Sequence, residues 1–113
     1  MSADNTVAND KPFLKLDHGK PRMDLLPPEA LVAVSQVLGF GAAKYQDHNW
    51  RKATNWGRYS AAAMRHLVAW MGGEDNDQES GLPHLAHSAC CLMFLIALQQ
   101  TAVGTDDRHK GAK

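Results

Sequence analysis

The chain has 113 residues, of which 44% are hydrophobic and 21% are charged, and its twelve Lys and Arg balance its twelve Asp and Glu. This length allows one domain with a single core, and the composition is that of an ordinary globular protein. Because the formal net charge is zero, the protein has no strong overall electrostatic field, and we expect neither a nucleic-acid polymer nor a membrane surface as a partner.

The N-terminal third predicts an irregular arm that leads into a helix. Residues 1–10 are polar and are expected to be disordered, and residues 11–24, with two prolines and a glycine, to form an ordered or semi-ordered arm in which Phe13 and Leu14 are the first to pack. A helix begins at Pro27-Pro28, where a missing N–H costs nothing. Its apolar stripe is made of Leu31, Val34, Leu38 and Ala42.

A polar connection and a second helix follow. Residues 45–55 carry Trp50, which is either a plug of the core or a stacking platform for a base. Thr54 or Asn55 can cap a helix that runs from Trp56 to Met71. The apolar face of this helix consists of Tyr59, Ala63, His66, Leu67 and Trp70.

A third helix is expected from about Pro83 to Val103, after Gly72-Gly73 has ended the second. It is apolar nearly all round, and such a helix has to be surrounded by others. Two further helices in one protomer cannot do this easily, so we expect an all-α bundle of about three main helices, completed by a homodimer or a higher homo-oligomer. The single domain spans residues 11–103, and residues 104–113 form a flexible tail.

Neither export nor membrane insertion is indicated. The polar N-terminus lacks the apolar region of a secretory signal, and the longest apolar run, residues 88–98, is too short to span a bilayer. Cys90 and Cys91 are adjacent in a helical run and cannot bridge each other, and free thiols fit a reducing compartment. We therefore expect a cytoplasmic protein.

The side chains that can bind a metal or take part in catalysis are concentrated between the second and third helices. Positions 74–87 hold four carboxylates and two histidines, and His84 and His87 continue the apolar stripe of the third helix into its first turn. Buried imidazoles need partners for their nitrogens, and the acidic loop supplies hydrogen-bond acceptors or fellow metal ligands. The candidate metal ligands are His66, Glu74, Asp77, Glu79, His84 and His87.

This donor set predicts a divalent cation. Oxygen ligands favour Mg²⁺ or Mn²⁺, whereas several imidazoles favour Mn²⁺ or another transition metal. The start of the third helix attracts an anion to the same place, which suits a nucleotide phosphate, and Glu74 or Asp77 is a candidate catalytic base. The substrate-binding candidates are Lys20, Arg22, Lys44, Arg51, Arg58 and Arg65 for phosphate, and Tyr45 and Trp50 for the base.

Four motifs in order carry a resemblance to a known family. They are Lys20-Pro21-Arg22-x-Asp24-Leu25-Leu26-Pro27; Phe40-Gly41-Ala42-x-Lys44-Tyr45 with Asn49-Trp50; Arg65-His66-x-x-Ala69-Trp70-x-x-Gly73-Glu74; and Asp77-x-Glu79-Ser80-Gly81-x-x-His84-Leu85-x-His87. Over residues 11–100 the chain resembles the phage dATP/dGTP diphosphohydrolases, which are related to the all-α MazG-like nucleotide pyrophosphohydrolases.

The resemblance implies that a divalent metal supports hydrolysis of dGTP or dATP to the monophosphate and pyrophosphate, in the host cytoplasm if a phage encodes the protein. MazG-like enzymes hold magnesium with two helical pairs of carboxylates. Here His84-x-x-His87 aligns with the second pair, and the only comparable acidic spacing is Glu74-x-x-Asp77 in the loop.

Two other hypotheses stay open. The histidines and carboxylates could form a structural metal site or a hydrogen-bonded helix junction in a non-catalytic helical module. Alternatively, the protein could be a metal phosphohydrolase that acts on a different phosphate ester.

Overall fold

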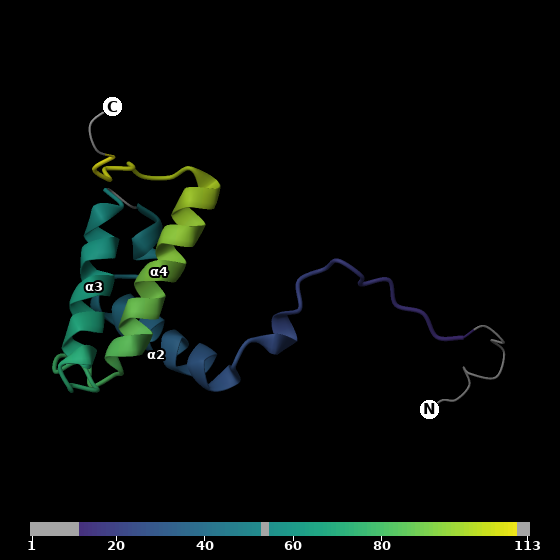
Figure 1. Ribbon diagram of the computed structural model, residues 1–113, viewed down its shortest axis with the longest axis horizontal. Coiled ribbons are helices and arrows are strands. Elements are labelled where there is room, and N and C mark those ends of the chain that lie inside the picture. The colour runs from purple at the N-terminus through teal and green to yellow at the C-terminus, as the bar shows by residue number, and fades with distance from the viewer. Residues whose placement is uncertain (1–11, 53–54, 111–113) are drawn as a thin grey trace.

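The computed structural model describes residues 12–52 and 55–110, and this part of the chain folds into three α-helices and two short 3₁₀ helices, without a β-strand (Figure 1). The elements are η1 Met23–Leu25, α2 Pro28–Lys44, η2 Asn49–Lys52, α3 Gly57–Met71 and α4 His84–Thr101. The prediction of an all-α fold with three main helices is confirmed. The predicted disorder of residues 1–10 and the predicted cap Thr54 lie outside the described residues.

Helices α3 and α4 form a hairpin, and α2 packs against α4 (Figure 1). The core cluster joins Val34 and Val37 of α2 to Ala86 and Cys90 of α4. Because Val34 and Val37 are three residues apart, they share a helix face, and small partners on α4 let the two helices approach closely.

The predicted stripe of α2 is only partly correct. Val34 is buried, but Leu31 and Leu38 remain exposed, because α4 lies on the side of α2 that carries Val34 and Val37. The two cysteines are free, as expected, with Cys90 buried and Cys91 partly buried.

The start of α3 is held by the end of the chain. Asn55 does not cap the helix with its side chain; instead the amide of Gly57 donates to Oδ1 of Asp107 at 2.8 Å. The indole Nε1 of Trp56 donates to the carbonyl of Val103 at 2.8 Å, and its backbone amide donates to the carbonyl of Thr105. The segment after α4 therefore returns across the top of the hairpin (Figure 1).

The arm of residues 12–27 runs away from the helices (Figure 1). It has local order, since Gly19 adopts a positive φ in a turn and Arg22 forms a bidentate ion pair with Asp24. Phe13 and Leu14 are exposed, so the expectation that they pack is wrong for a single copy of the chain: the arm points away from the core that would cover them. Among the described residues, no helix is long and apolar enough to cross a membrane.

Candidate functional site

The loop between α3 and α4 is folded by its own backbone. Gly73 and Gly81 have φ of 101° and 72°, values that favour glycine, and they turn the chain at each end of the acidic segment. The amide of Asp77 donates to the carbonyl of Leu82 at 2.8 Å, and the amide of His84 donates to the carbonyl of Asp75 at 2.9 Å. The loop is thereby drawn back against the start of α4.

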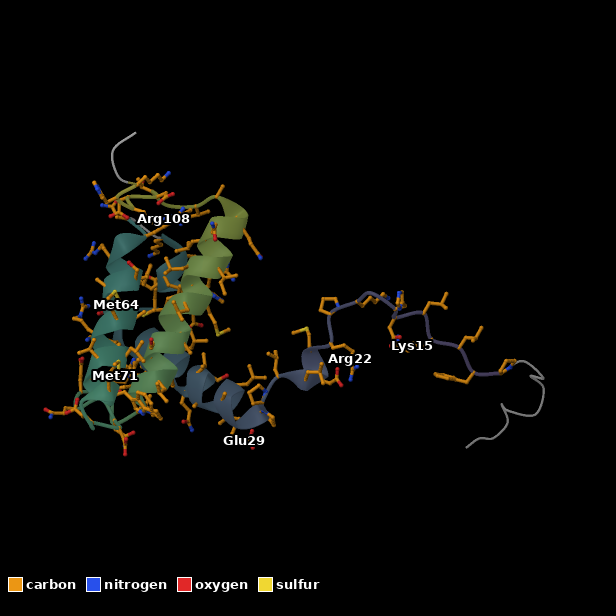
Figure 2. The ribbon with its side chains drawn as sticks, in the orientation of Figure 1. Lys15, Arg22, Glu29, Met64, Met71 and Arg108 are labelled. Atoms are coloured by element: carbon orange, nitrogen blue, oxygen red, sulfur yellow. The ribbon has the colours of Figure 1, made fainter. Side chains whose placement is uncertain are left out.

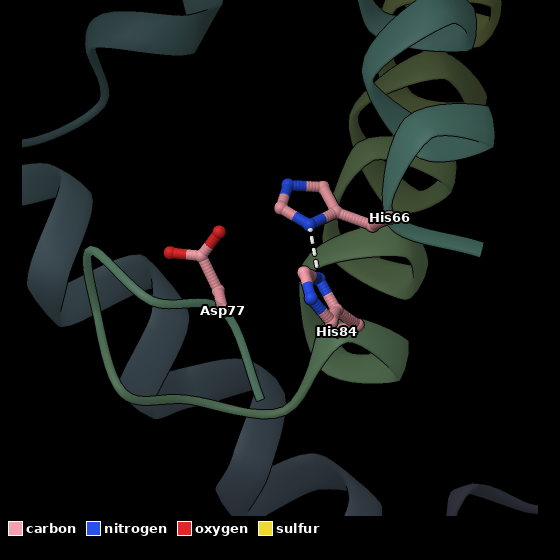
Figure 3. Close-up of side chains that lie close together, drawn as sticks. All are labelled: His66, Asp77 and His84. Atoms are coloured by element: carbon pink, nitrogen blue, oxygen red, sulfur yellow. Dashed lines mark hydrogen bonds between the residues drawn. The ribbon is translucent and has the colours of Figure 1, made fainter. Parts of the chain in front are cut away.

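Asp77 is fixed by the turn that follows it. Its Oδ2 accepts hydrogen bonds from the amides of Glu79 at 3.1 Å and Ser80 at 2.9 Å, an arrangement typical of aspartate in turns. The second carboxylate oxygen takes no part in these two bonds. Figure 3 shows the carboxylate of Asp77 facing the imidazoles of His66 and His84.

The three predicted histidines meet beside this loop. Nδ1 of His66, from α3, lies 2.9 Å from Nδ1 of His84, from α4 (Figure 3). The ring of His87, one turn further along α4, stacks on His66 with ring centroids 4.5 Å apart. Nε2 of His87 lies 2.7 Å from the hydroxyl of Ser80.

His84 is the most buried member of the group, at 5% exposure, and it lies between two partners. Its Nε2 is 2.6 Å from Oε1 of Glu74. Because an ionised carboxylate can only accept, Nε2 carries the hydrogen and Nδ1 presents a lone pair. The hydrogen bond to Glu74 therefore fixes the tautomer in which Nδ1 of His84 accepts a hydrogen bond from Nδ1 of His66, and the same lone pair would bind a metal ion in its place.

These residues fit a divalent transition metal. One ligand atom each from His66, Asp77 and His84 lies within 4.8 Å of the others. Two nitrogens bound to one ion at about 2.0–2.1 Å, with a ligand angle near 90–110°, would be about 2.8–3.4 Å apart, and the observed Nδ1 to Nδ1 separation is 2.9 Å. Two imidazoles and a carboxylate suit Mn²⁺, Fe²⁺, Co²⁺ or Zn²⁺ better than Mg²⁺.

The pKa shifts in the site favour neutral imidazoles and ionised carboxylates, the protonation states that bind a metal. Burial, followed by the nearby His87, lowers the pKa of His66, and burial also lowers the pKa of His87. The hydrogen bond from His84 lowers the pKa of Glu74. Burial alone would raise the pKa of Asp77, but the hydrogen bonds from Ser80 and the nearby His87 and His66 together outweigh it and leave the pKa below its usual value. At neutral pH, His66 and His87 are neutral and both carboxylates are ionised.

The other predicted residues are more scattered. Glu79, predicted as a ligand, pairs through Oε2 with Nζ of Lys44 at 2.7 Å, which ties the loop to the end of α2. Lys20 and Arg22 lie on the arm, which the structure carries away from the histidines (Figures 1 and 2). Arg58 and Arg65 are exposed on α3.

The aromatic candidates differ in how much surface they offer. Trp50 stacks on Phe94 with ring centroids 4.6 Å apart, while the guanidinium of Arg51 lies 4.3 Å from its ring centre. This contact with Phe94 is the packing expected of a core plug. Tyr45 remains largely exposed beside Lys44, whose Nζ is 5.5 Å from the ring centre.

Two contributors to the site were not predicted from the sequence. Ser80 binds His87 with its hydroxyl and Asp77 with its amide, and Gln78 donates to Oε2 of Glu74 at 3.0 Å. The spacing Asp77-x-x-Ser80 is a signal for an aspartate turn and could have indicated the first of these contacts.

Comparison with known proteins agrees with the four motifs. Residues 10–108 match a family model described as dATP/dGTP diphosphohydrolase, N-terminal. The chain is 35% identical over 99 residues to a protein of Salmonella phage PMBT28 named dATP/dGTP diphosphohydrolase, an alignment that covers 88% of this chain and 34% of that protein. The chain thus spans about a third of the length of this curated relative. No solved structure matches.

Proposed function

Because the chain belongs to the dATP/dGTP diphosphohydrolase N-terminal family, we propose that it hydrolyses a purine deoxynucleoside triphosphate, dGTP or dATP, to the monophosphate and pyrophosphate with a divalent cation. The observation that carries the proposal is the cluster of His66, Asp77 and His84, three ligand atoms from two helices and a loop within 4.8 Å of one another.

In this proposal the chain holds the cation through Nδ1 of His66, Nδ1 of His84 and the carboxylate of Asp77. Bound there, the cation would polarise phosphoryl oxygens and acidify a water. Glu74 positions His84 by accepting the hydrogen bond from Nε2. Both oxygens of Glu74 have partners, in His84 and Gln78, so its carboxylate is better placed to orient the imidazole than to take a proton from water.

The substrate contacts would come from the cationic side chains nearest the loop. Lys44 is held beside the loop by Glu79, and the triphosphate would compete with that carboxylate for the ammonium group. Tyr45 follows Lys44 directly and offers an exposed ring on which a base could stack. Arg65 precedes His66 and is exposed, so it could reach a phosphate from α3.

The test is an assay of the purified chain with dGTP and dATP, each with Mn²⁺, Mg²⁺ or no metal, followed by identification of the products. The proposal expects the nucleoside monophosphate and pyrophosphate in equal amounts. His84→Ala and Asp77→Ala should abolish turnover in folded protein, whereas His48→Ala, a change at an exposed histidine, should not. Release of orthophosphate without added pyrophosphatase would point to another reaction.

Two observations favour a second candidate, a non-catalytic metal-binding helical module. His84 is buried and already bonded to Glu74, and two of the predicted phosphate-binding residues, Lys20 and Arg22, lie on the arm. Chelation separates the two functions. Removal of a structural ion should unfold the helices, whereas removal of a catalytic ion should leave the circular dichroism spectrum unchanged and abolish only turnover.

A further inference from the structure

The rings of His66 on α3 and His87 on α4 lie face to face beside the loop of residues 72–83. Their centroids are 4.5 Å apart and their planes are inclined by only 11°. His84 meets the ring of His66 differently, at a centroid distance of 5.1 Å and with an angle of 46° between the planes. His66 therefore has a stacking partner in His87 and a partner for its nitrogen in His84.

Two stacked imidazoles cannot both bind one ion. The lone pair of an imidazole nitrogen lies in the plane of its ring, and a metal ion binds along that direction at about 2.0–2.1 Å. Planes inclined by 11° meet only far from the rings, so the lone pairs of His66 and His87 do not converge. The tilted rings of His66 and His84 instead bring their Nδ1 atoms to 2.9 Å (Figure 3). In the described chain, Asp77 completes the cluster of ligand atoms within 4.8 Å of one another, and His87 lies outside it.

One nitrogen of His87 is already occupied by the loop. Its Nε2 lies 2.7 Å from the hydroxyl of Ser80, and that hydroxyl also accepts a hydrogen bond from the amide of Leu82 at 3.1 Å. The amide of Ser80 donates to Oδ2 of Asp77 at 2.9 Å. Ser80 thus joins an imidazole of α4 to the backbone of the loop and to a candidate ligand. His87 is half-buried, and its contacts with Ser80 and His66 fix the plane of its ring.

The ring of His66 needs this support more than that of His84 does. A ligating histidine usually donates its second ring N–H to an outer partner, which fixes the orientation of the ring. Glu74 is that partner for His84. Among the described residues, no group forms a hydrogen bond with Nε2 of His66, and the last side-chain torsion of a histidine is only loosely restricted. The face of His87 is therefore the contact that keeps Nδ1 of His66 directed at His84.

We infer that His87 and Ser80 are positioning residues of the cation site: Ser80 fixes the ring of His87, and His87 fixes the ring of His66, which binds the ion. This role replaces the one predicted for His87 from the sequence, that of a metal ligand. It rests on the cation site of the proposed function and is independent of the reaction that the ion supports. Each imidazole ligand then has an outer partner of its own, Glu74 for His84 and His87 for His66.

Nuclear magnetic resonance of the histidine nitrogens in the unaltered protein tests the inference. Protein with isotope-labelled histidine is titrated with Zn²⁺, a diamagnetic ion, and the six histidines are assigned by single substitutions. One nitrogen each of His66 and His84 should move to the chemical shift of a metal-bound imidazole, whereas both nitrogens of His87 should stay in the range of a free imidazole. A metal-bound shift at His87 would overturn the inference.

The same titration separates this inference from the proposed function. If none of the three histidines showed a metal-bound shift, both the cation site and the positioning role would be overturned. His66 and His84 bound to Zn²⁺, with His87 free and no hydrolysis of dGTP in the assay with Mn²⁺ or Mg²⁺, would support the positioning role and contradict the proposed reaction alone.

Substitutions of Ser80 test its contact with His87. Ser80→Ala removes the hydroxyl and keeps the amide that donates to Asp77, so it should weaken Zn²⁺ binding about tenfold in calorimetry. Ser80→Thr keeps a hydroxyl and should restore most of the affinity. Ser60→Ala is the matched control, because it removes a hydroxyl that bonds only to the carbonyl of Gly57 on α3. Circular dichroism verifies the fold of each variant. Equal affinities for folded Ser80→Ala and Ser60→Ala would overturn the inference.

Discussion

Oε1 of Glu74 accepts a hydrogen bond from Nε2 of His84 at 2.6 Å, on the opposite side of the imidazole from the nitrogen that faces His66. The carboxylate would therefore act on the proposed cation site through the ring. This pattern of carboxylate, histidine and metal raises the basicity of the ligand nitrogen and fixes the orientation of the ring.

Glu74→Ala should weaken Mn²⁺ binding by about 10- to 100-fold, because the orientation and tautomer of His84 are no longer fixed. Glu74→Gln should have a smaller effect, since its amide oxygen can still accept from Nε2. Isothermal titration calorimetry measures both affinities. Glu79→Gln is the matched control, because Glu79 pairs with Lys44 and should leave the affinity unchanged. Wild-type affinity in Glu74→Ala would show that Glu74 has no role in positioning His84.

Asp107→Ala should lower the free energy of unfolding by about 1 kcal/mol, because the amide of Gly57 loses the acceptor that caps α3. A carboxylate at this end of a helix also interacts favourably with the helix dipole. Urea denaturation gives the value, and Asp47→Ala, at an exposed position in the loop after α2, serves as the control. Equal midpoints for the two variants would show that the hydrogen bond from Gly57 to Asp107 adds no stability.

Both thiols should resist modification in the folded protein at pH 7.5. Burial raises the pKa of Cys90 to about 12 and also raises the pKa of Cys91, so very little thiolate is present at either position. Ellman's reagent should label Cys91 slowly and Cys90 more slowly still, and in urea it should label both at once. Fast labelling of Cys90 without denaturant would contradict its place in the core.

Acidification from pH 7.5 to 5.5 should lower the melting temperature of the metal-free protein. His66 and His87 have lowered pKa values when folded, so below about pH 6.5 the unfolded chain binds more protons than the folded chain. The stability that they contribute is complete above that pH and is lost as the pH falls.

The double variant His66→Gln, His87→Gln should show a shallower dependence of melting temperature on pH between 5.5 and 7.5. A double variant of the exposed histidines His18 and His48 should keep the wild-type slope. If both double variants had the same slope, the acid sensitivity would have another source.

The three helices could be predicted because their ends are marked by local chemistry. Pro27-Pro28 predicted the start of α2, Gly72-Gly73 the end of α3 and Pro83 the start of α4, each within one residue of the observed limit. The meeting of His66 with His84 was also predictable, since a hairpin brings the end of one helix beside the start of the next. Such features depend on residues that are near in sequence or on the direction of a short connection.

Contacts set by the exact path of the chain could not be predicted. Glu74 faces His84 because the loop folds back through the hydrogen bond between His84 and Asp75, a detail of backbone geometry that no spacing encodes. The bond between Gly57 and Asp107 joins positions fifty residues apart. On α2, Leu31 and Val37 are equally suited to a core, and only the position of α4 decides between them.

The return of the chain end to Gly57 determines where anything joined to it would emerge. His66 lies nine residues further along α3, roughly 14 Å at 1.5 Å per residue. A tag or a fused domain attached after residue 110 would therefore leave the molecule at the far end of the hairpin from Asp77 and His84. A label, a surface or a second protein joined at that end would then leave the proposed cation site uncovered.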